Sequence, residues 1–390
     1  MHKTPLNKSG LKVYLNRSVR CVPQAICLVV IGALALSTIG LSANDAKRKI
    51  IVGDDGFSLM HLLLLGAEDV EVIGLTSVTG NSWANRVTAY NLRGLELLGK
   101  RDVPVAEGAT YPLVNTQRQT ELWEKLYGRL TWKGAWMKKW VEETIQEAPI
   151  YYGPNDPVDD IPWGAPKTKP ISKIAANFMV EMVRKYPGEV TILEGGPLTN
   201  IALAQRLDPE FASLAKELIY MGGSFNPQQT LDNEIAAQFA REFKNSPRRE
   251  FNIRFDPEAA SIVSRAPWRK ITVIPVDPST STQLTPALLN KLADVAPPAM
   301  GEVMRNWGVG FPLWDEIAAA VWLDPSLIKD QNTLYVDYNT TFGPSYGDTL
   351  SWSEDYQPGL GERLTRVIRS VDGAGLESLL LRNVGRLNQE

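Results

Sequence analysis

A short apolar run that ends in two adjacent carboxylates constrains this chain more than any other feature. Ile50–Val52 follows a charged segment and favours a buried strand, because its three residues are apolar and β-branched. Asp54-Asp55-Gly56 comes next, and a helix is expected from Leu59. An open α/β sheet places its ligand site at the carboxyl ends of such strands. The alternative is a plain turn with an aspartate that caps the helix.

The same alternation of strand and helix continues along the chain. Strands are expected at Ile50–Val52, Val70–Val78 and Val103–Ala106, with helices to Gly66 and over Trp83–Leu98. Further strands are expected over residues 189–193, 218–221 and 271–276. We therefore predict an α/β fold with an open, mainly parallel sheet flanked by helices and a Rossmann-like core. Residues 44–390 contain no linker or repeat and are expected to form a single domain.

The N-terminus has the pattern of a secretory signal peptide. The first twenty residues contain five basic residues and no acid, and Ala25–Leu41 is apolar apart from two hydroxyl residues. We expect residues 1–43 to be cleaved near Ser42 or Ala43, which makes the mature protein secreted or periplasmic. An uncleaved membrane anchor is the alternative, because the run approaches the roughly 17 residues that span a bilayer.

Cleavage would change both the cysteine content and the charge. Cys21 and Cys27 lie in the signal segment, so disulfides would not contribute to the mature fold. Removing five of the 41 basic residues against 44 acidic ones leaves a net charge of about −8. An acidic surface argues against a nucleic-acid partner but not against small neutral ligands. No stable membrane association is expected after cleavage.

Several motifs together resemble the nucleoside hydrolase family. They are the double acid at Asp54-Asp55, the runs Val72–Asn81 and Asp102–Ala109, and the Gly-Pro-Leu-Thr-Asn sequence at Gly196–Asn200. Enzymes of that family cut the N-glycosidic bond of nucleosides with a calcium ion held by an aspartate-rich N-terminal loop. The resemblance implies the same fold and a small-molecule nucleoside as substrate.

The resemblance also implies a calcium site. Its ligands would be Asp54, Asp55, the backbone carbonyl of Gly195 and Asp315, all of them the hard oxygen donors that calcium prefers. One of the first two aspartates would deprotonate the attacking water, Asp55 if the loop is aligned with a gap and Asp54 if it is not. Asp315 could otherwise simply cap a helix that starts at this point.

Four further residues are expected to hold the sugar. In the family an asparagine after a glycine contacts the ribose and metal, which falls on Asn81, and Met221 falls near the sugar pocket. Glu250 and Asn252 stand two residues apart, so on an extended strand they would share a face. The family uses this Glu-x-Asn pair for the ribose hydroxyls. The alternatives are a polar turn at Asn81 and a solvated strand edge at Glu250 and Asn252.

The chain departs from the family pattern at the metal loop. Gly53 replaces the first aspartate of the loop in the gapped alignment, and Ser58 and Leu59 replace its last pair. Ser58 and His61 lie one helical turn apart and are candidates for substrate contact, with a core-packed histidine as the alternative.

A second departure concerns the leaving base. Trp314 stands where the family has a histidine that assists its departure. An indole has no titratable proton near neutral pH, so stacking or a rearranged pocket would have to replace that help, and stacking favours a purine.

Two segments outside these motifs leave alternatives open. The stretch from Tyr111 to Pro170 is expected to be either an amphipathic helix packed on the core or a flap whose aromatic faces stack on a base. Its tryptophans are Trp123, Trp132, Trp136, Trp140 and Trp163. The polar stretch Asn226–Arg249 has a helical pattern and is expected to be an insertion.

The function expected from the sequence is hydrolysis of nucleosides, with a preference for purines, by a calcium-bound water that an aspartate activates. A non-catalytic secreted relative that binds nucleosides or sugars is the alternative, because acids and the histidine are missing. A homo-oligomer is compatible with either function.

Overall fold

Nine strands form one sheet in which the first six all run parallel. The computed structural model describes residues 46–137, 151–227 and 246–389, so the expected signal peptide, Trp140 and most of the expected insertion at 226–249 lie outside the described residues. In spatial order the strands are β3 (Val105–Glu107), β2 (Val70–Ser77), β1 (Arg48–Asp54), β4 (Val190–Glu194), β5 (Glu217–Met221), β6 (Ile271–Ile274), β9 (Arg363–Val371), β7 (Ile328–Tyr338) and β8 (Thr349–Trp352). The predicted mainly parallel α/β sheet is confirmed. Its antiparallel edge, β7 with β8 and β9, is a feature that the sequence patterns did not indicate.

The strand order reverses between β1 and β4. From β1 the chain builds outward to β2 and β3, then returns to the other side of β1 for β4, β5 and β6. A parallel sheet opens a crevice at the carboxyl ends of the two strands where the direction of winding reverses. Asp54 ends β1 and Glu194 ends β4, so both residues lie at this switch point.

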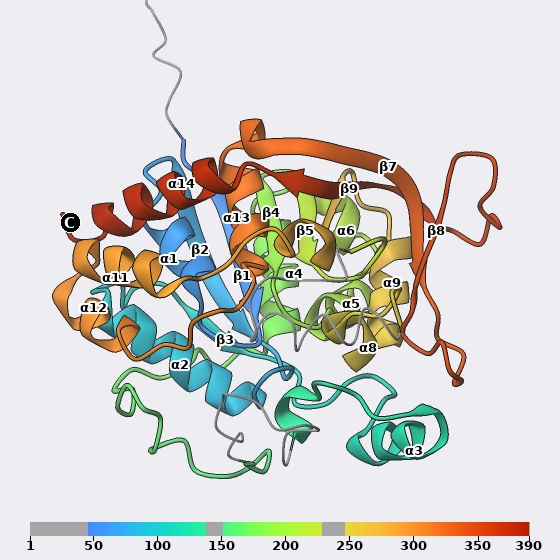
Figure 1. Ribbon diagram of the computed structural model, residues 1–390, viewed down its shortest axis with the longest axis horizontal. Coiled ribbons are helices and arrows are strands. Elements are labelled where there is room, and N and C mark those ends of the chain that lie inside the picture. The colour runs from blue at the N-terminus through green and yellow to red at the C-terminus, as the bar shows by residue number, and fades with distance from the viewer. Residues whose placement is uncertain (1–45, 138–150, 228–245, 390) are drawn as a thin grey trace, which may run out of the picture. The chain divides into compact units, whose positions relative to one another are not determined.

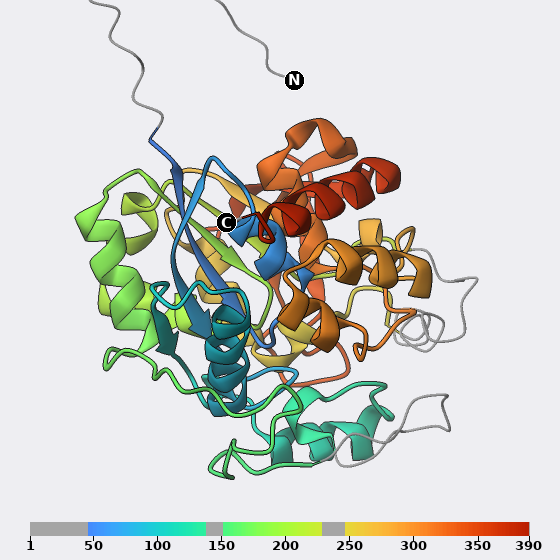
Figure 2. The ribbon, with the colours of Figure 1, turned by 90° about the vertical axis from the view of Figure 1, so that its left-hand side faces the viewer.

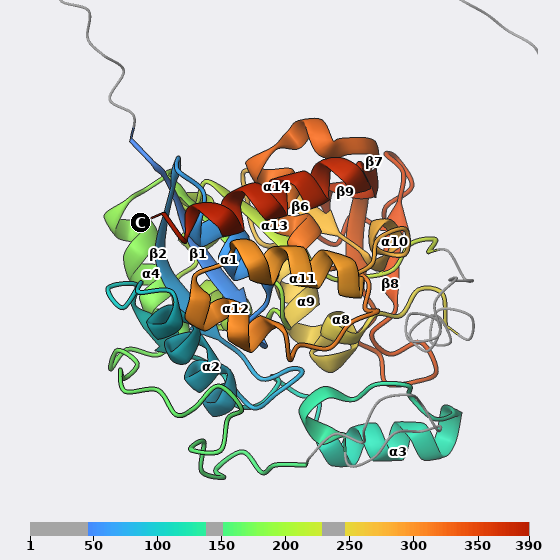
Figure 3. The ribbon, with the colours of Figure 1, turned by 60° about the vertical axis from the view of Figure 1, so that its left-hand side comes forward.

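Helices cover both faces of the sheet, and alternate strand residues point to each of them. Ile50 and Val52 belong to one buried cluster and Ile51 to another, as the two-residue period of a strand requires. The helices over the first face are α1 (Leu59–Leu65), α2 (Ala84–Leu97), α11 (Pro286–Val295), α12 (Pro298–Met304), α13 (Asp315–Leu323) and α14 (Gly373–Arg386). The helices over the second face are α4 (Ala175–Lys185), α5 (Thr199–Leu207), α6 (Phe211–Leu214) and α9 (Pro257–Arg265). Figures 1 and 3 show α14 and α11 on the same side of the sheet as α1.

The segment between β3 and α4 lies at one end of the sheet. It contains α3 (Gln117–Tyr127) and η1 (Gly134–Trp136), which lie below the carboxyl ends of the parallel strands in Figures 1 and 2. Trp123 and Trp136 are buried, and Trp136 stacks on Phe255 with ring centroids 4.3 Å apart. These two tryptophans are buried in two small clusters of their own, apart from the two main core clusters. No helix among the described residues is long and apolar enough to cross a membrane.

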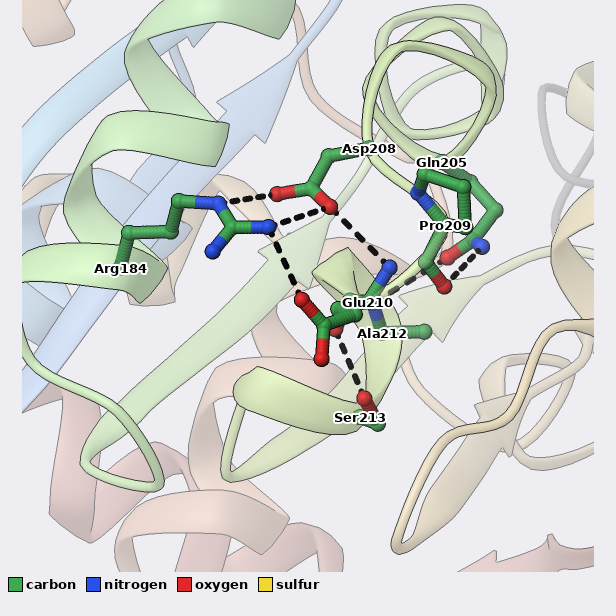
Figure 4. Close-up of polar contacts among 7 residues, drawn as sticks. All are labelled: Arg184, Gln205, Asp208, Pro209, Glu210, Ala212 and Ser213. Carbon is green, nitrogen blue, oxygen red and sulfur yellow. Dashed lines mark hydrogen bonds and ion pairs between the residues drawn. The ribbon is translucent and has the colours of Figure 1, made fainter.

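A charged cluster fastens α4 to the end of α5 on the second face. Arg184 donates through Nη2 to the Asp208 carboxylate at 2.8 Å and to Glu210 at 3.2 Å (Figure 4). Asp208 also accepts from the backbone N–H of Glu210 at 3.1 Å. The Arg184 guanidinium lowers the pKa of Asp208, so this carboxyl stays ionised at neutral pH.

Helix α1, which follows the double acid, is held by a close backbone contact with α14. Asn383 donates its side-chain amide to the Leu63 carbonyl at 3.1 Å, and a Cβ on Gly66 would lie 1.9 Å from the Asn383 carbonyl oxygen. Only glycine permits this approach. By contrast, a Cβ on Gly373 at the start of α14 would meet nothing within 4 Å.

We expect Gly66→Ala to lower the free energy of unfolding by about 1–3 kcal/mol, because the added methyl group forces α14 away from α1. Gly373→Ala is the matched control and should be neutral or stabilise the protein by up to about 1 kcal/mol. Urea unfolding followed by circular dichroism measures both variants. Equal effects would show that the α1–α14 contact is not tight.

Candidate functional site

The carboxylates that follow β1 are buried although they stand where the chain leaves the sheet. Asp54 accepts from the Asp55 backbone N–H at 2.7 Å and from the Ser58 hydroxyl at 3.4 Å. Ser58 is the N-cap of α1, so the turn between strand and helix wraps around this carboxyl. Burial raises the pKa of Asp54 to about 6.

Asp55 is clamped by Asn81 at the end of the neighbouring strand β2. The backbone N–H of Asn81 donates to one carboxylate oxygen at 2.7 Å, and its side-chain amide donates to the other at 2.9 Å. A Cβ on Gly80 would lie 2.0 Å from the Asp55 carboxylate, which explains the glycine there. Burial and then the nearby Asp54 charge raise the pKa of Asp55 well above its usual value. The structure therefore brings together two predicted site residues from two strands.

Asp315, 260 positions after Asp55, reaches the same place. It is the first residue of α13, and burial followed by the Asp54 charge raises its pKa well above the usual range. A Cβ added to Gly195, which directly follows β4, would lie 3.0 Å from Asp54 Oδ1 and 3.0 Å from Asp315 Cγ. The predicted convergence of the double acid, Gly195 and Asp315 is therefore present in the fold.

Glu194 is a fourth buried carboxyl at this place, and sequence reasoning did not single it out. It ends β4, directly opposite Gly53 of β1 in the parallel register. Burial and then the Asp54 charge raise its pKa well above the usual value. The available signal was a glutamate at the end of an otherwise apolar strand, immediately before the Gly-Gly-Pro turn.

Asn252 and Met221 line the other side of Gly195. The Asn252 side chain donates to the Gly195 carbonyl at 2.7 Å and to the Met221 carbonyl at 3.2 Å. Met221 ends β5 and packs with Val276 and the half-buried Trp314. Trp314 directly precedes Asp315, so the residues that pack with Met221 adjoin the segment that carries this carboxylate.

The expected extended strand at Glu250 and Asn252 is wrong. Glu250 is the N-cap of helix α8 (Phe251–Phe255), and its carboxylate accepts from the backbone N–H groups of Asn252 and Ile253 at 2.8 and 3.1 Å. It also accepts from the Gly223 N–H at 3.1 Å. An acidic residue at a helix N-terminus satisfies donors that would otherwise lack partners, and this local gain determines the helix. Glu250 and Asn252 remain close to Gly195 by this different route.

His61 lies inside the core rather than at an open surface. Its imidazole is buried, stacks on Phe57 at 4.6 Å and accepts from the Ser58 backbone N–H through Nδ1 at 3.2 Å. Burial lowers the pKa of His61 to about 3, so the ring is neutral. This geometry favours the core-packed alternative and leaves no charged imidazole to act as an acid.

One tryptophan of the segment between β3 and α4 reaches the site. Trp132 donates its indole N–H to Asn81 Oδ1 at 2.6 Å, while its carbonyl accepts from Arg254 at 2.8 Å. Asn81 therefore lies between Asp55 and an indole ring. Several tryptophans in the segment had equivalent sequence contexts, so only the tertiary structure distinguishes Trp132.

The donor chemistry of the site fits a hard cation. Among the described residues no lysine or arginine forms an ion pair with Asp54, Asp55, Glu194 or Asp315. Buried charges are stable when they are paired or bind a metal. Within the described ranges no three His, Cys, Asp or Glu side chains are arranged to hold one ion. Asp54 Oδ1 and the Asp315 carboxylate both lie near Gly195, so a hard cation at this place would have to draw its further oxygen ligands toward it.

Fold and site together define an α/β protein with a buried carboxylate site at its topological switch point. The family model of inosine-uridine preferring nucleoside hydrolases matches residues 51–378. The chain therefore belongs to this family.

Curated relatives include two types of nucleosidase. Uridine nucleosidase 1 of Arabidopsis thaliana is 34% identical over 252 residues, which cover 63% of this chain and 62% of that protein. The pyrimidine-specific ribonucleoside hydrolase RihB of Escherichia coli is 26% identical over 322 residues, 78% of this chain and 87% of that protein. The alignments with the plant relatives thus span about three-fifths of their length.

Solved structures of the family share the fold. A plant nucleoside hydrolase superposes with a TM-score of 0.63 at 24% identity, covering 87% of this chain and 99% of that chain. An inosine-guanosine nucleoside hydrolase superposes with a TM-score of 0.65 at 21% identity, covering 86% and 98%. At these identities the likeness establishes the fold alone.

We expect Asp54→Asn to stabilise the metal-free protein at pH 8. With a folded pKa of about 6 against 3.8 for a free carboxyl, ionised Asp54 destabilises the fold by about 1–3 kcal/mol above pH 6. The destabilisation begins near pH 4 and is absent below it. Urea unfolding in a chelator at pH 4 and pH 8 measures the difference.

Asp208→Asn is the control of opposite sign. Since Arg184 lowers the pKa of Asp208, its ionised carboxylate stabilises the fold, and the variant should be less stable than the wild type at both pH values, because both lie above that lowered pKa. An effect of Asp54→Asn that is the same at both pH values would contradict the assigned burial of this charge.

Proposed function

We propose that this protein hydrolyses the N-glycosidic bond of nucleosides. The observation that carries the proposal is the meeting of Asp54 and Asp315 around Gly195, with Asp55 next to Gly196, at the switch point of a nucleoside hydrolase fold. The names of the relatives, uridine nucleosidase and ribonucleoside hydrolase, support the same reaction class.

In the proposed reaction Asp55 is the general base. Asn81 holds both of its oxygens from one side, and each oxygen keeps a lone pair for the proton of an attacking water. The water oxygen bonds to C1′ of the sugar while the C1′–N bond breaks and its electron pair leaves with the base. The Asp55 carboxyl then releases its proton to solvent. Asp54 is the second candidate for the base because the two carboxyls are adjacent.

The proposed cofactor is calcium. Asp54, Asp55, Asp315 and the Gly195 carbonyl would hold it, consistent with the absence of basic partners for these carboxyls among the described residues. A bound calcium ion would supply the positive charge that keeps the carboxylates ionised and favours ionisation of a nearby water.

The sugar and the base would lie beside Gly195 and Trp314. Asn252 and Glu250 lie close to that point, and together with Asn81 and Met221 they are proposed to contact the ribose. Ser58, at the rim of the Asp54 carboxylate, is a further proposed contact. Trp314 cannot protonate the departing base, so the base takes its proton from solvent. Stacking on this indole supports the proposed preference for purines.

The N-terminal segment bears on where the protein acts. We propose a secreted or periplasmic protein whose residues 1–43 are a cleaved signal peptide, because that segment alone carries the basic start and the apolar run. Small nucleosides rather than nucleic acid are the proposed ligands.

We expect the mature protein to release free base from inosine and adenosine faster than from uridine, measured by chromatography with added calcium. Asp55→Asn should lower kcat by at least about 100-fold, because it removes the general base. Glu189→Gln, an exposed residue that pairs with Lys49 at the other end of the sheet, is the control and should leave kcat unchanged. Faster release from uridine would overturn the purine preference. Nucleoside binding without any turnover would favour a non-catalytic binding protein.

We also expect Asp315→Asn to weaken calcium binding by at least about tenfold, because it removes one charged oxygen ligand. Titration calorimetry of the metal-free protein with calcium measures the dissociation constant, again with Glu189→Gln as the control. Unchanged calcium binding and unchanged activity would refute the metal role of Asp315.

A further inference from the structure

Gly53 and Glu194 face each other across the β1–β4 pair. The two residues are register partners, and the Gly195 N–H donates to the Gly53 carbonyl at 2.8 Å. A Cβ on Gly53 would lie 2.1 Å from Glu194 Oε2 and 2.7 Å from Oε1. The Glu194 carboxyl therefore fills the volume that a side chain at position 53 would need.

One oxygen of this carboxyl has no hydrogen-bond partner. Glu194 is fully buried, and its Oε1 accepts from the Gly196 N–H at 3.2 Å. Oε2 is buried and without a partner among the described residues. The charged groups that act on it are Asp54 and, less strongly, Asp55. A strand glutamate thus keeps an oxygen without a hydrogen-bond partner beside Gly53, the residue that directly precedes the double acid.

Such an arrangement is costly unless something binds the bare oxygen. A buried acceptor without a donor destabilises a fold, and like charges nearby increase the penalty. A glutamine or an apolar residue would avoid both. A cation shared with the neighbouring carboxylates satisfies the free oxygen and removes the repulsion.

The sequence contains the complementary change. The nucleoside hydrolase pattern has an aspartate at the position of Gly53 in the gapped alignment, and this chain has lost that side chain from β1. Loss of the side chain at position 53 opens the space, and the neighbouring strand fills it with a carboxyl group of the same charge.

We propose that Glu194 supplies, from β4, the carboxylate that β1 lacks at Gly53, and that it is an additional cation-binding residue of the cluster formed by Asp54, Asp55 and Asp315. The inference rests on the calcium dependence of the proposed function and adds a residue to it. It explains how a loop with fewer acids than the family pattern keeps its negative charge.

Calcium titration calorimetry on the metal-free mature protein tests the proposal. Glu194→Gln keeps the size of the side chain and removes its charge, so we expect calcium to bind at least about tenfold more weakly than to the wild type. Glu217→Gln is the matched control, because Glu217 is also a buried strand glutamate but lies at the amino end of β5 and pairs with Lys270. Its calcium affinity should equal that of the wild type. Equal affinity of Glu194→Gln and the wild type would overturn the proposal.

Moving the carboxylate back to β1 gives a second, independent readout. Gly53→Asp alone should lower the melting temperature and impair calcium binding, because its side chain collides with Glu194. Gly53→Asp combined with Glu194→Ala should recover calcium affinity to within about tenfold of the wild type. A double variant that binds calcium no better than Glu194→Ala alone would contradict an exchange of roles.

Release of free base, assayed in parallel, separates this inference from the proposed function. One outcome is that the wild type and Glu194→Gln both hydrolyse nucleosides and that their activities depend on calcium in the same way. The role of Glu194 is then refuted, and the hydrolase function stands. If the wild type binds no calcium, the role of Glu194 is refuted whether or not base is released. If no base is released although Glu194→Gln weakens calcium binding, the inference stands and the hydrolase function fails.

Discussion

The parallel pairing of β1 with β4 is the contact on which the site depends. It sets Gly53, the residue before Asp54, opposite Glu194 at the point where the winding of the sheet reverses. Both strands leave the sheet there by turns rich in glycine, so backbone and carboxyl groups approach closely without side chains between them. Asp55, held by β2 through Asn81, and Asp315 at the start of α13 then meet the same turn.

Concentrated buried charge is the physical cost of this arrangement. Burial raises the pKa of Asp54, Asp55, Glu194 and Asp315, and each of the last three is also raised by the Asp54 charge. A fold selected only for stability would replace such groups with apolar side chains. Their presence together at a switch point is typical of a site whose ligand neutralises them. The same repulsion that destabilises the metal-free protein would thus drive cation binding.

The surroundings of the carboxylates differ from the pattern that the sequence resemblance suggests. The neutral, buried His61 contributes to the turn before α1, and Trp314 brings an aromatic surface to the position of a proton donor. Trp132 adds a second indole next to Asn81. A base would therefore meet stacking surfaces, and its departure would depend on stabilisation of the sugar and water by the carboxylates and amides.

The sequence by itself determined the fold class and much of the site. The runs Ile50–Val52 and Val190–Leu193 are short, rich in β-branched residues and followed by turn residues, which favours strands. Such patterns are local, so a single sequence displays them. The acids that follow the first strand were predicted from the same pattern. Motif resemblance then added Gly195 and Asp315, which the fold brings together.

Only the tertiary structure decided the rest. The local cap of Glu250 favours a helix, and the Gly223 N–H, which comes from another part of the chain, adds a contact to the same carboxylate that no sequence pattern shows. The choice of Trp132 among several tryptophans depends on the position of Asn81, and the importance of Glu194 depends on the register that sets it against Gly53. These are contacts between residues distant in sequence, and no local pattern records them because their energies arise when the sheet assembles.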